Sequence, residues 1–392
     1  MSTEGRTAEA TPAPLESAGF VRLVSSADGD ALAATGLLAR AIRERGTPFQ
    51  VTVGRTVTER TERATIGEPE TDDATIVVGS ADADLEAIRL AATDRAATLE
   101  AAELVRELGE APDPVLALAG LVAAGSEPGA GESEWVLETA RDRGLVGRRP
   151  GVAVPTADPV DGLAHSTRVR APWSGDPDAV RDALSGLELP EPDALEASDH
   201  RAIGSLVALD AVGAEDTVEA SARSIGRALK PYATPEGPFA TVGGYADVLA
   251  ATARTEPGTG VALAMGHGVD RAALETWRTH GRRAHAALDS ASGSRHDGLF
   301  VLGIEDGPVE TVAEIAVAYR SPEPTVLVVG DGEAALATRT GESLGSTVEA
   351  IARALEDDVD GLEYDDGRRR GYLRYDPETD DSTIIATTRE FR

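Results

Sequence analysis

Two aspartates, Asp28 and Asp30, stand in a D-x-D pattern between a short apolar segment and an alanine-rich one. The residues from Val21 alternate as in a half-buried strand, and those from Ala31 onward have the composition of a helix. Carboxylates at a strand end can both point at one divalent cation, because hard cations such as Mg²⁺ and Mn²⁺ prefer oxygen ligands. The spacing therefore indicates a metal site or the remains of one.

Three consecutive arginines, Arg368, Arg369 and Arg370, precede Tyr372 in a β-like segment. Guanidinium groups bind phosphate in bidentate geometry, and a tyrosine ring can stack on a base. The run is therefore a candidate phosphate-binding site. The alternative is a solvated hairpin edge that its charge protects from pairing.

The six histidines show none of the spacings between imidazole and carboxylate that are typical of zinc sites. His165 lies in the segment "AHSTRVRAPWSGD" and either lines a cleft or forms a buried, hydrogen-bonded imidazole. Asp199 opens a helical pattern, where a carboxylate favours the positive end of the helix dipole. We therefore expect no zinc, and we interpret Asp199 as a helix-start residue.

These residues need an α/β framework to position them. Strand-like and helix-like segments alternate, which favours a mostly parallel sheet, then a helical stretch at 176–230, then a second α/β region. The expected strands lie at residues 20–24, 49–53, 74–80, 260–266, 297–304 and 324–332, with β-like segments at 368–375 and 382–388. The expected helices lie at residues 31–45, 84–108, 114–124, 243–254 and 346–355, with two more ending near 287 and 318.

The composition is strongly acidic. The chain of 392 residues has a net charge of −31, contains no cysteine, and has Lys230 as its only lysine. This pattern is typical of haloarchaeal proteins, which work in a salt-saturated cytoplasm. Molar salt shortens the Debye length to about 3 Å, so the net charge neither supports nor excludes a nucleic-acid partner. Without cysteine, disulfide and thiolate chemistry are excluded.

The chain has no apolar run long enough for a membrane span and no apolar leader. We therefore expect a cytoplasmic protein that does not act at a membrane. Residues 1–17 are polar and are expected to be a disordered tail.

The segment "SSADGDALAATGLLARAI" resembles the first motif of the DHH phosphoesterases, H-x-D-x-D-G followed by an alanine-rich helix. Two later segments, Gly162–Asp176 and Gly237–Gly266, resemble archaeal RecJ-like members of that superfamily. Arg254 stands at the final arginine of their E-F-A-x-x-L-N-A-x-G-R stretch. The likeness runs in a consistent order from about residue 20 to residue 345.

This resemblance implies a DHH domain at 18–185, a helical connector at 186–235, and a smaller DHH-associated domain at 236–392. It also implies a two-metal phosphodiesterase site in the cleft between the domains, holding Mn²⁺ or Mg²⁺. Arg339 matches a strand-end arginine near the scissile phosphate, and the arginine run matches a phosphate-contacting G-G-H motif, here without its histidine. His165, Arg254 and Arg339 are thus expected to bind phosphate.

The sequence departs from the motifs that hold metal. Ser26 replaces the histidine of the first motif and Ala31 its glycine, while Gly79 and Ser80 stand where an aspartate is expected. Asp82 and Asp84 lie slightly late for that position, the D-H-H tripeptide is absent with Asp94 as its only remnant, and the fourth motif reads Gly125-Ser126. Asp28 and Asp30 alone supply too few carboxylates for a tightly held metal pair.

We therefore expect a RecJ-like protein of DNA replication or repair that has lost its nuclease chemistry. It would bind single-stranded nucleic acid or act as a scaffold, with GINS or other replication-fork proteins as candidate partners, and would require no cofactor. The alternative is an active Mn²⁺- or Mg²⁺-dependent single-strand 5′ exonuclease or oligonucleotide phosphodiesterase that uses Asp28, Asp30, Asp82 and His165. A nucleotide-sensing module without a DNA role also fits an α/β cleft.

Overall fold

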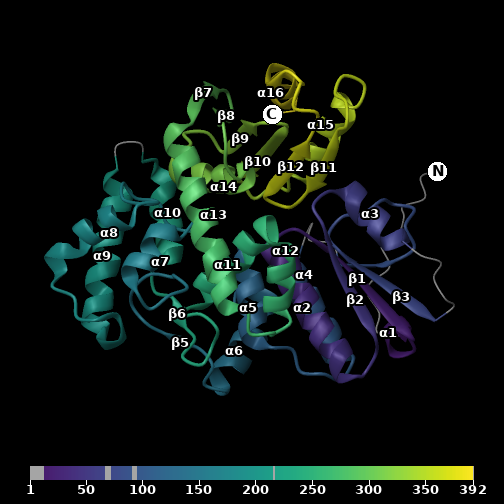
Figure 1. Cartoon of the computed structure of the whole chain (residues 1–392), viewed down its shortest axis with the longest axis horizontal. Coiled ribbons are helices and arrows are strands. Elements are labelled where there is room, and N and C mark those ends of the chain that lie inside the picture. The colour runs from purple at the N-terminus through teal and green to yellow at the C-terminus, as the bar shows by residue number, and fades with distance from the viewer. Residues whose placement is uncertain (1–12, 67–71, 91–94, 215–216, 392) are drawn as a thin grey trace.

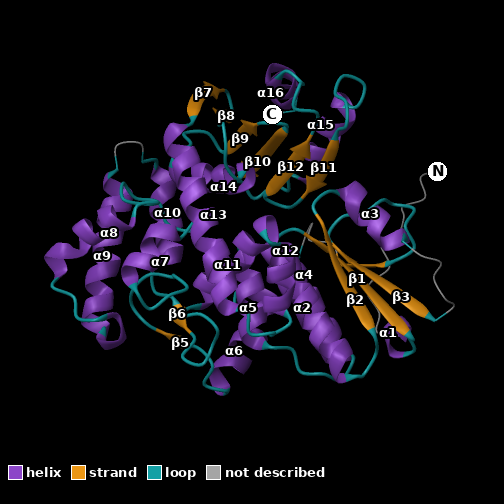
Figure 2. Ribbon diagram, viewed as in Figure 1, coloured by secondary structure: helices purple, strands orange, loops and turns teal. Residues whose placement is uncertain are grey.

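The computed structural model describes residues 13–66, 72–90, 95–214 and 217–391. The first strands of the chain and the last strands form two separate main sheets, with helices between them (Figures 1 and 2). This is the α/β architecture with two sheet regions and a helical middle that the sequence predicts, so the fold class is confirmed.

The N-terminal sheet has four parallel strands in the order β2-β1-β3-β4. In a parallel sheet the carboxyl ends of all strands lie at the same edge. The loops after the neighbouring strands β1 and β3 therefore lie side by side. The elements of this region are α1 (Ala13–Glu16), β1 (Phe20–Ser26), α2 (Gly29–Glu44), β2 (Phe49–Gly54), α3 (Val57–Thr65), β3 (Asp73–Val78), β4 (Ile88–Leu90), α4 (Ala97–Glu107), α5 (Pro114–Ala123), the short 3₁₀ turn η1 (Gly131–Ser133) and α6 (Glu134–Asp142).

Helix α2 is buried along nearly its whole length. Asp28 caps its N-terminus by accepting a hydrogen bond from the amide of Ala31, 2.9 Å away. The helix packs against α4, α5, α11 and β1, which explains why its sequence is apolar on almost every side. Gly36 permits the close approach of α12, because a Cβ there would lie 2.6 Å from the carbonyl oxygen of Ala264. The residues just before α2 are therefore held firmly at the sheet edge.

The middle of the chain is helical, as predicted. Its elements are β5 (Gly147–Arg148), α7 (Pro159–His165), α8 (Pro177–Leu184), η2 (Ser185–Leu187), η3 (Pro192–Ala194), α9 (Ala197–Gly213), α10 (Glu219–Ala228) and β6 (Tyr232–Ala233). Asp199 lies in the first turn of α9 and accepts a hydrogen bond from the amide of Glu196, 2.8 Å away, in a capping box. The prediction that Asp199 is a helix-start residue is confirmed.

Three helices follow the middle region: α11 (Val242–Thr255), α12 (Pro257–Ala264) and α13 (Asp270–Ser290). Side chains of these helices, from Val242 to Trp277, share one hydrophobic core with β1, α2, α4 and α5. The packing thus groups residues 242–277 with the N-terminal sheet, whereas the predicted domain boundary lay at residue 236. The boundaries themselves stay a prediction.

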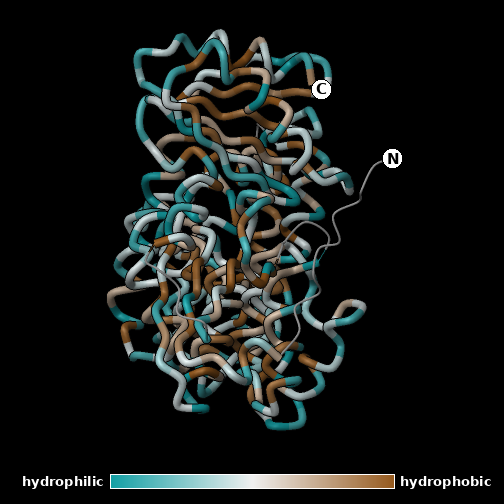
Figure 3. The backbone as a smooth tube through the Cα atoms, turned by 90° about the vertical axis from the view of Figure 1, so that its right-hand side faces the viewer, coloured by the Kyte–Doolittle hydropathy of each residue, from teal (hydrophilic) through white to brown (hydrophobic). Residues whose placement is uncertain are grey.

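The C-terminal sheet has six strands in the order β11-β12-β10-β9-β8-β7, and only β8 and β9 run parallel. Helix α14 covers one face, and α15 and α16 cover the other, each over its own apolar core; these strands appear as hydrophobic segments in Figure 3. The elements are β7 (Ser292–His296), β8 (Leu299–Gly303), α14 (Val309–Tyr319), β9 (Thr325–Gly330), β10 (Glu333–Thr338), α15 (Gly345–Leu355), β11 (Glu363–Asp366), β12 (Arg370–Arg374) and α16 (Asp381–Glu390).

Two segments predicted as strands are helices. Residues 260–266 belong mostly to α12, because a short apolar run fits a buried helix as well as a buried strand, and Pro257 starts this helix. Residues 382–388 belong to α16, whose N-terminus is capped by the side chain of Asp380. The helix predicted at 84–108 is shorter, since β4 precedes α4.

The start of the described chain also differs from its prediction. Residues 13–16, expected to belong to a disordered tail, form α1, and its Leu15 is 3% exposed. Among the described residues, no helix combines the length and the apolar composition that crossing a bilayer requires.

Candidate functional site

Asp28 follows the carboxyl end of β1, where the sequence predicts a metal site or the remains of one. One carboxylate oxygen caps α2, and the other accepts a hydrogen bond from the Arg370 guanidinium, 2.7 Å away. Burial would raise the pKa of Asp28, but Arg370 and the Ala31 amide together hold this pKa below its usual value. The carboxylate is therefore charged, and its partner is an arginine.

Asp30 has a different task. Its two carboxylate oxygens accept hydrogen bonds from the amides of Ala97 and Thr98, each 2.9 Å away, at the N-terminus of α4. Burial and the nearby Asp28 charge raise the pKa of Asp30 to about 6. The two aspartates of the D-x-D pattern thus do not face one common centre.

The second strand end also lacks a metal ligand. Gly79, after β3, has a φ of 113°, and a Cβ there would lie 2.9 Å from the Cβ of Ser26. An aspartate at this position would be strained and crowded. Asp82 lies on an exposed loop, where its carboxylate accepts a hydrogen bond from the backbone amide of Asp84, 3.3 Å away. Asp94 lies outside the described residues.

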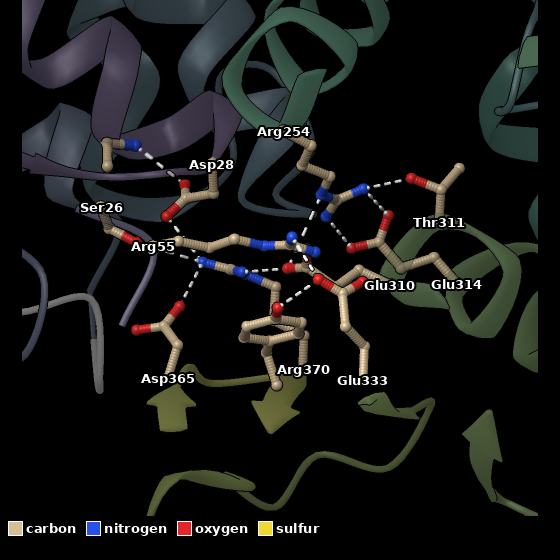
Figure 4. Close-up of polar contacts among 12 residues, drawn as sticks. Ser26, Asp28, Arg55, Arg254, Glu310, Thr311, Glu314, Glu333, Asp365 and Arg370 are labelled. Carbon is tan, nitrogen blue, oxygen red and sulfur yellow. Dashed lines mark hydrogen bonds and ion pairs between the residues drawn. The ribbon is translucent and has the colours of Figure 1, made fainter. Parts of the chain in front are cut away.

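The Arg370 guanidinium lies at the centre of the predicted metal site (Figure 4). It contacts Asp28 at 2.7 Å, Glu310 at 3.0 Å and Asp365 at 3.3 Å, and it donates to the Ser26 hydroxyl at 3.4 Å. Burial would lower the pKa of Arg370, but the surrounding carboxylates raise it well above its ordinary value. A fixed organic cation therefore neutralises these carboxylates.

Three more arginines extend this cluster, which we call the central charge network. Arg60 pairs with Asp365 at 2.6 Å, Arg55 bridges Glu310 and Glu333 at 3.0 and 2.8 Å, and Arg254 binds Glu314 at 2.5 Å. The network joins the β1–α2 loop and α11 to α14 and the C-terminal sheet (Figure 4), and Arg60 adds a link from α3 to β11. It comprises Arg55, Arg60, Arg254 and Arg370 with Asp28, Glu310, Glu314, Glu333 and Asp365.

The metal pair implied by the resemblance does not fit this arrangement. Within the described residues, no group of three or more histidines, cysteines and carboxylates is placed to hold a metal ion. The carboxylates near Asp28 are already paired with guanidinium groups, and Asp30 is used as a helix cap. We therefore derive no chemical step that involves a metal.

Tyr372 does not offer a base-stacking surface, contrary to the sequence prediction. Its side chain is fully buried, the Arg55 guanidinium lies 4.0 Å from its ring centre, and its hydroxyl donates to Glu333 at 2.6 Å. The reason is strand alternation: Arg370, Tyr372 and Arg374 occupy every second position of β12. Arg370 and Tyr372 reach the network, and Arg374 reaches Glu59 beside it.

A cavity of about 340 Å³ opens beside the central charge network. We call it the arginine cleft, because nine arginines and only five acidic residues line it, in a chain of net charge −31. The arginines are Arg95, Arg168, Arg223, Arg227, Arg254, Arg339, Arg368, Arg369 and Arg370, and the acidic residues are Asp28, Asp30, Asp247, Glu314 and Asp366.

Several cleft arginines have no acidic partner in the described part of the chain. Arg223 and Arg227 are exposed, one turn apart on α10, and Arg368 and Arg369 lie in the turn between β11 and β12. Burial, together with the nearby charges of Arg227 and Arg368, lowers the pKa of Arg369. An anion would relieve the repulsion between cations that lie close together at a cavity wall.

The remaining predicted residues have structural partners. His165 is 6% exposed, lies within hydrogen-bonding distance of the Asp161 carbonyl at 2.9 Å, and meets the Trp277 ring edge-on. Of the two interpretations of His165, the buried, hydrogen-bonded imidazole is therefore the one that the structure supports. His165 is not among the residues that line the cleft. Arg339 lines the cleft but donates to the carbonyls of Val317 and Ser321, at 3.2 and 3.0 Å.

Sequence reasoning missed Arg223, Arg227 and Glu310. The first two had a detectable signal, because arginines four residues apart on a helix face the same side. Glu310 had none, since an acidic residue in the first turn of a helix is ordinarily a favourable dipole contact rather than part of a site.

The two sheet regions and the helices between them define an α/β protein with a CDC45-like fold. CDC45 from Entamoeba histolytica superimposes with a TM-score of 0.59, 10% identity and 95% coverage of both chains, which shows a shared fold. Exonuclease RecJ bound to manganese is a more distant neighbour, with a TM-score of 0.46, 15% identity, and coverage of 100% of this chain and 94% of RecJ.

The particular family follows from sequence. The chain is 46% identical over 370 residues to "Uncharacterized protein rrnAC1427" of Haloarcula marismortui, covering 92% of this chain and 94% of that protein. The family model "Uncharacterized protein rrnAC1427, C-terminal domain" matches residues 291–390. The protein belongs to the rrnAC1427 family, and a haloarchaeal relative agrees with the composition.

Proposed function

We propose that the protein binds single-stranded nucleic acid in the arginine cleft and does not cleave it. The observation that carries this proposal is the group formed by Arg227, Arg368 and Arg369, which line one cavity without acidic partners among the described residues. A phosphodiester chain supplies regularly spaced anions that would relieve their mutual repulsion.

The central charge network supports the proposal that the protein does not cleave the strand. A phosphodiesterase that uses two metals needs several free carboxylates to hold them, whereas Arg370 already pairs with Asp28, Glu310 and Asp365. Bidentate guanidinium contacts retain specific geometry in molar salt, where little counterion release remains to drive binding.

A role as a binding or scaffold subunit in DNA replication or repair fits this chemistry. The resemblance to archaeal RecJ-like proteins, which associate with the GINS complex, supports that setting. GINS or another replication-fork protein is therefore the partner that we propose, and binding in the cytoplasm without a cofactor is the expected mode.

The binding test compares two double variants that change the net charge equally. Fluorescence anisotropy of a labelled single strand in multimolar KCl should show at least tenfold weaker binding for Arg227→Gln/Arg369→Gln, a loss of about 1.4 kcal/mol. The control Arg181→Gln/Arg271→Gln removes exposed arginines outside the cleft and should bind like the native protein. Equal affinities for the two variants would contradict a site in the cleft.

A separate assay tests the claim that no cleavage occurs. A 5′-labelled single strand incubated with Mn²⁺ in multimolar KCl should remain intact. Release of labelled product that disappears in Asp28→Asn would restore the exonuclease alternative, because it would require Asp28 to leave Arg370 and bind metal.

A further inference from the structure

We propose that the arginine cleft recognises the chain of phosphates alone and leaves the bases unread, so that an abasic strand or inorganic polyphosphate binds as well as DNA. This inference rests on the proposed function and specifies the ligand chemistry of the same site. Its basis is the set of side chains that the cleft presents and the set that it lacks.

The first observation is the scarcity of aromatic surface. Proteins that hold single strands through their bases stack those bases on aromatic side chains. In the described part of the chain, Tyr319 is the only aromatic residue that lines the cleft, and it is 5% exposed. Its hydroxyl donates to the Arg168 carbonyl at 2.7 Å, so the ring is fixed in the wall.

The second observation concerns the side chains that read base edges. Asparagine and glutamine are the residues that pair in bidentate fashion with adenine. The whole sequence contains no asparagine, and its one glutamine, Gln50, is exposed on β2 and is not among the residues lining the cleft. Readout of bases by side-chain amides in the cleft is therefore excluded by composition.

The third observation is what remains in the cleft. Apart from the charged residues, the lining consists mainly of small residues and hydroxyls, including Ser26, Ser126, Ser224, Thr167 and Thr338. Hydroxyl groups and guanidinium groups both donate to phosphate oxygens. Thr167, Ser224 and Thr338 already donate to Asp247, Ala318 and Pro324, so the donors left for a phosphate are chiefly the guanidinium groups.

The geometry also suits a linear ligand. Arg223 and Arg227 lie one turn apart on α10, and Arg368 and Arg369 contribute from the β11–β12 turn across the same cavity. Two pairs of guanidinium groups from separate elements can contact successive phosphates of one chain. A repeating phosphate chain is the shared chemistry of nucleic-acid backbones and inorganic polyphosphate.

The test uses the full-length protein in multimolar KCl, with circular dichroism to verify that it is folded. Anisotropy would compare labelled oligothymidine, a mixed-sequence strand containing guanine, and an abasic strand of equal length, and unlabelled polyphosphate would compete with each. We expect affinities within threefold of one another, competition by polyphosphate, and loss of all binding in Arg227→Gln/Arg369→Gln.

The outcomes separate this inference from the function on which it rests. An abasic strand that binds at least tenfold more weakly than oligothymidine would overturn phosphate-only recognition while leaving nucleic-acid binding intact, and so would a tenfold preference for the guanine-containing strand. Polyphosphate that fails to compete would overturn its inclusion as a ligand and restrict the cleft to sugar–phosphate chains. If no strand binds, both proposals fall.

Discussion

Arg369 and Arg370 are neighbours in the sequence but lie in two contrasting regions of the molecule. Arg370 also lines the arginine cleft, but its guanidinium belongs to the central charge network, within 3.3 Å of three carboxylates. Arg369 lines the arginine cleft, where Arg227 and Arg368 are its nearby charges. Two arginines of one run therefore differ in their partners. Arg370 is neutralised by carboxylates, whereas Arg369 faces a cavity among other cations.

The difference teaches that acidic partners, rather than arginines, distinguish the two regions. In the network the carboxylates come from the β1–α2 loop, α14, β10 and β11, and they pair with each of the four guanidinium groups. In the cleft the arginines outnumber the acidic residues. We expect network substitutions to change stability and cleft substitutions to change binding.

The largest expected effect is that of Arg370→Met. Methionine cannot neutralise Asp28, Glu310 and Asp365, and removing one partner from a buried ion cluster typically costs about 3–5 kcal/mol. Urea unfolding in multimolar KCl, followed by circular dichroism, measures this loss in the free energy of unfolding.

The matched control is Arg368→Met, which removes an exposed arginine of the cleft from the same run. Its free energy of unfolding should stay within about 0.5 kcal/mol of the native value. Equal losses of stability in the two variants would show that Arg370 stabilises the fold no more than an exposed arginine of the cleft does.

The second prediction concerns pH. His280 lies between the hydroxyls of Thr255 and Thr311, each 2.8 Å away, and burial beside Arg254 lowers its pKa from 6.5 to about 3. Between these values the unfolded chain binds a proton and the folded chain does not. The His280 contribution to stability is thus fully present above pH 6.5 and is lost at about 1.4 kcal/mol per pH unit as the pH falls.

The measurement compares His280→Gln with the native protein from about pH 7 to about pH 5. The comparison with the native protein is needed because burial raises the pKa of Glu100 to about 7. Protonation of Glu100 stabilises the folded chain as the pH falls, which opposes the effect of His280 over the same range. The variant should gain relative stability as the pH falls, whereas the exposed control His267→Gln should not. A pH-independent difference for His280→Gln would show that this imidazole binds protons equally in the folded and the unfolded chain, which contradicts a lowered pKa.

The smallest expected effect is that of Tyr372→Phe. This change removes the hydroxyl that donates to Glu333 at 2.6 Å and should lower the free energy of unfolding by about 1 kcal/mol. Strand affinity should be unchanged, because the ring lies in the network rather than in the cleft. Weaker strand binding at an unchanged free energy of unfolding would instead show that Tyr372 contacts the ligand.

Much of the architecture could be predicted from the sequence. Alternation places β1, and short apolar runs rich in β-branched residues place β3, β8 and β9, because both signals are local properties of the chain. The short apolar run of α12 could not be assigned correctly, since a buried helix and a buried strand have the same composition there.

The candidate site divides in the same way. The sequence by itself determined that the metal motifs are incomplete, that arginine is almost the only cation, and that side-chain amides are nearly absent. These are facts of residue type and need no coordinates.

Only the tertiary structure decided which charges meet. Asp28 and Arg370 are 342 positions apart, and Arg60 and Asp365 are 305 apart, so no local pattern could pair them. Coulomb interactions depend on distance and burial in the folded chain, not on sequence separation. For that reason folding alone turned one arginine of a run into the counter-ion of the predicted metal site and left its neighbour facing the cleft.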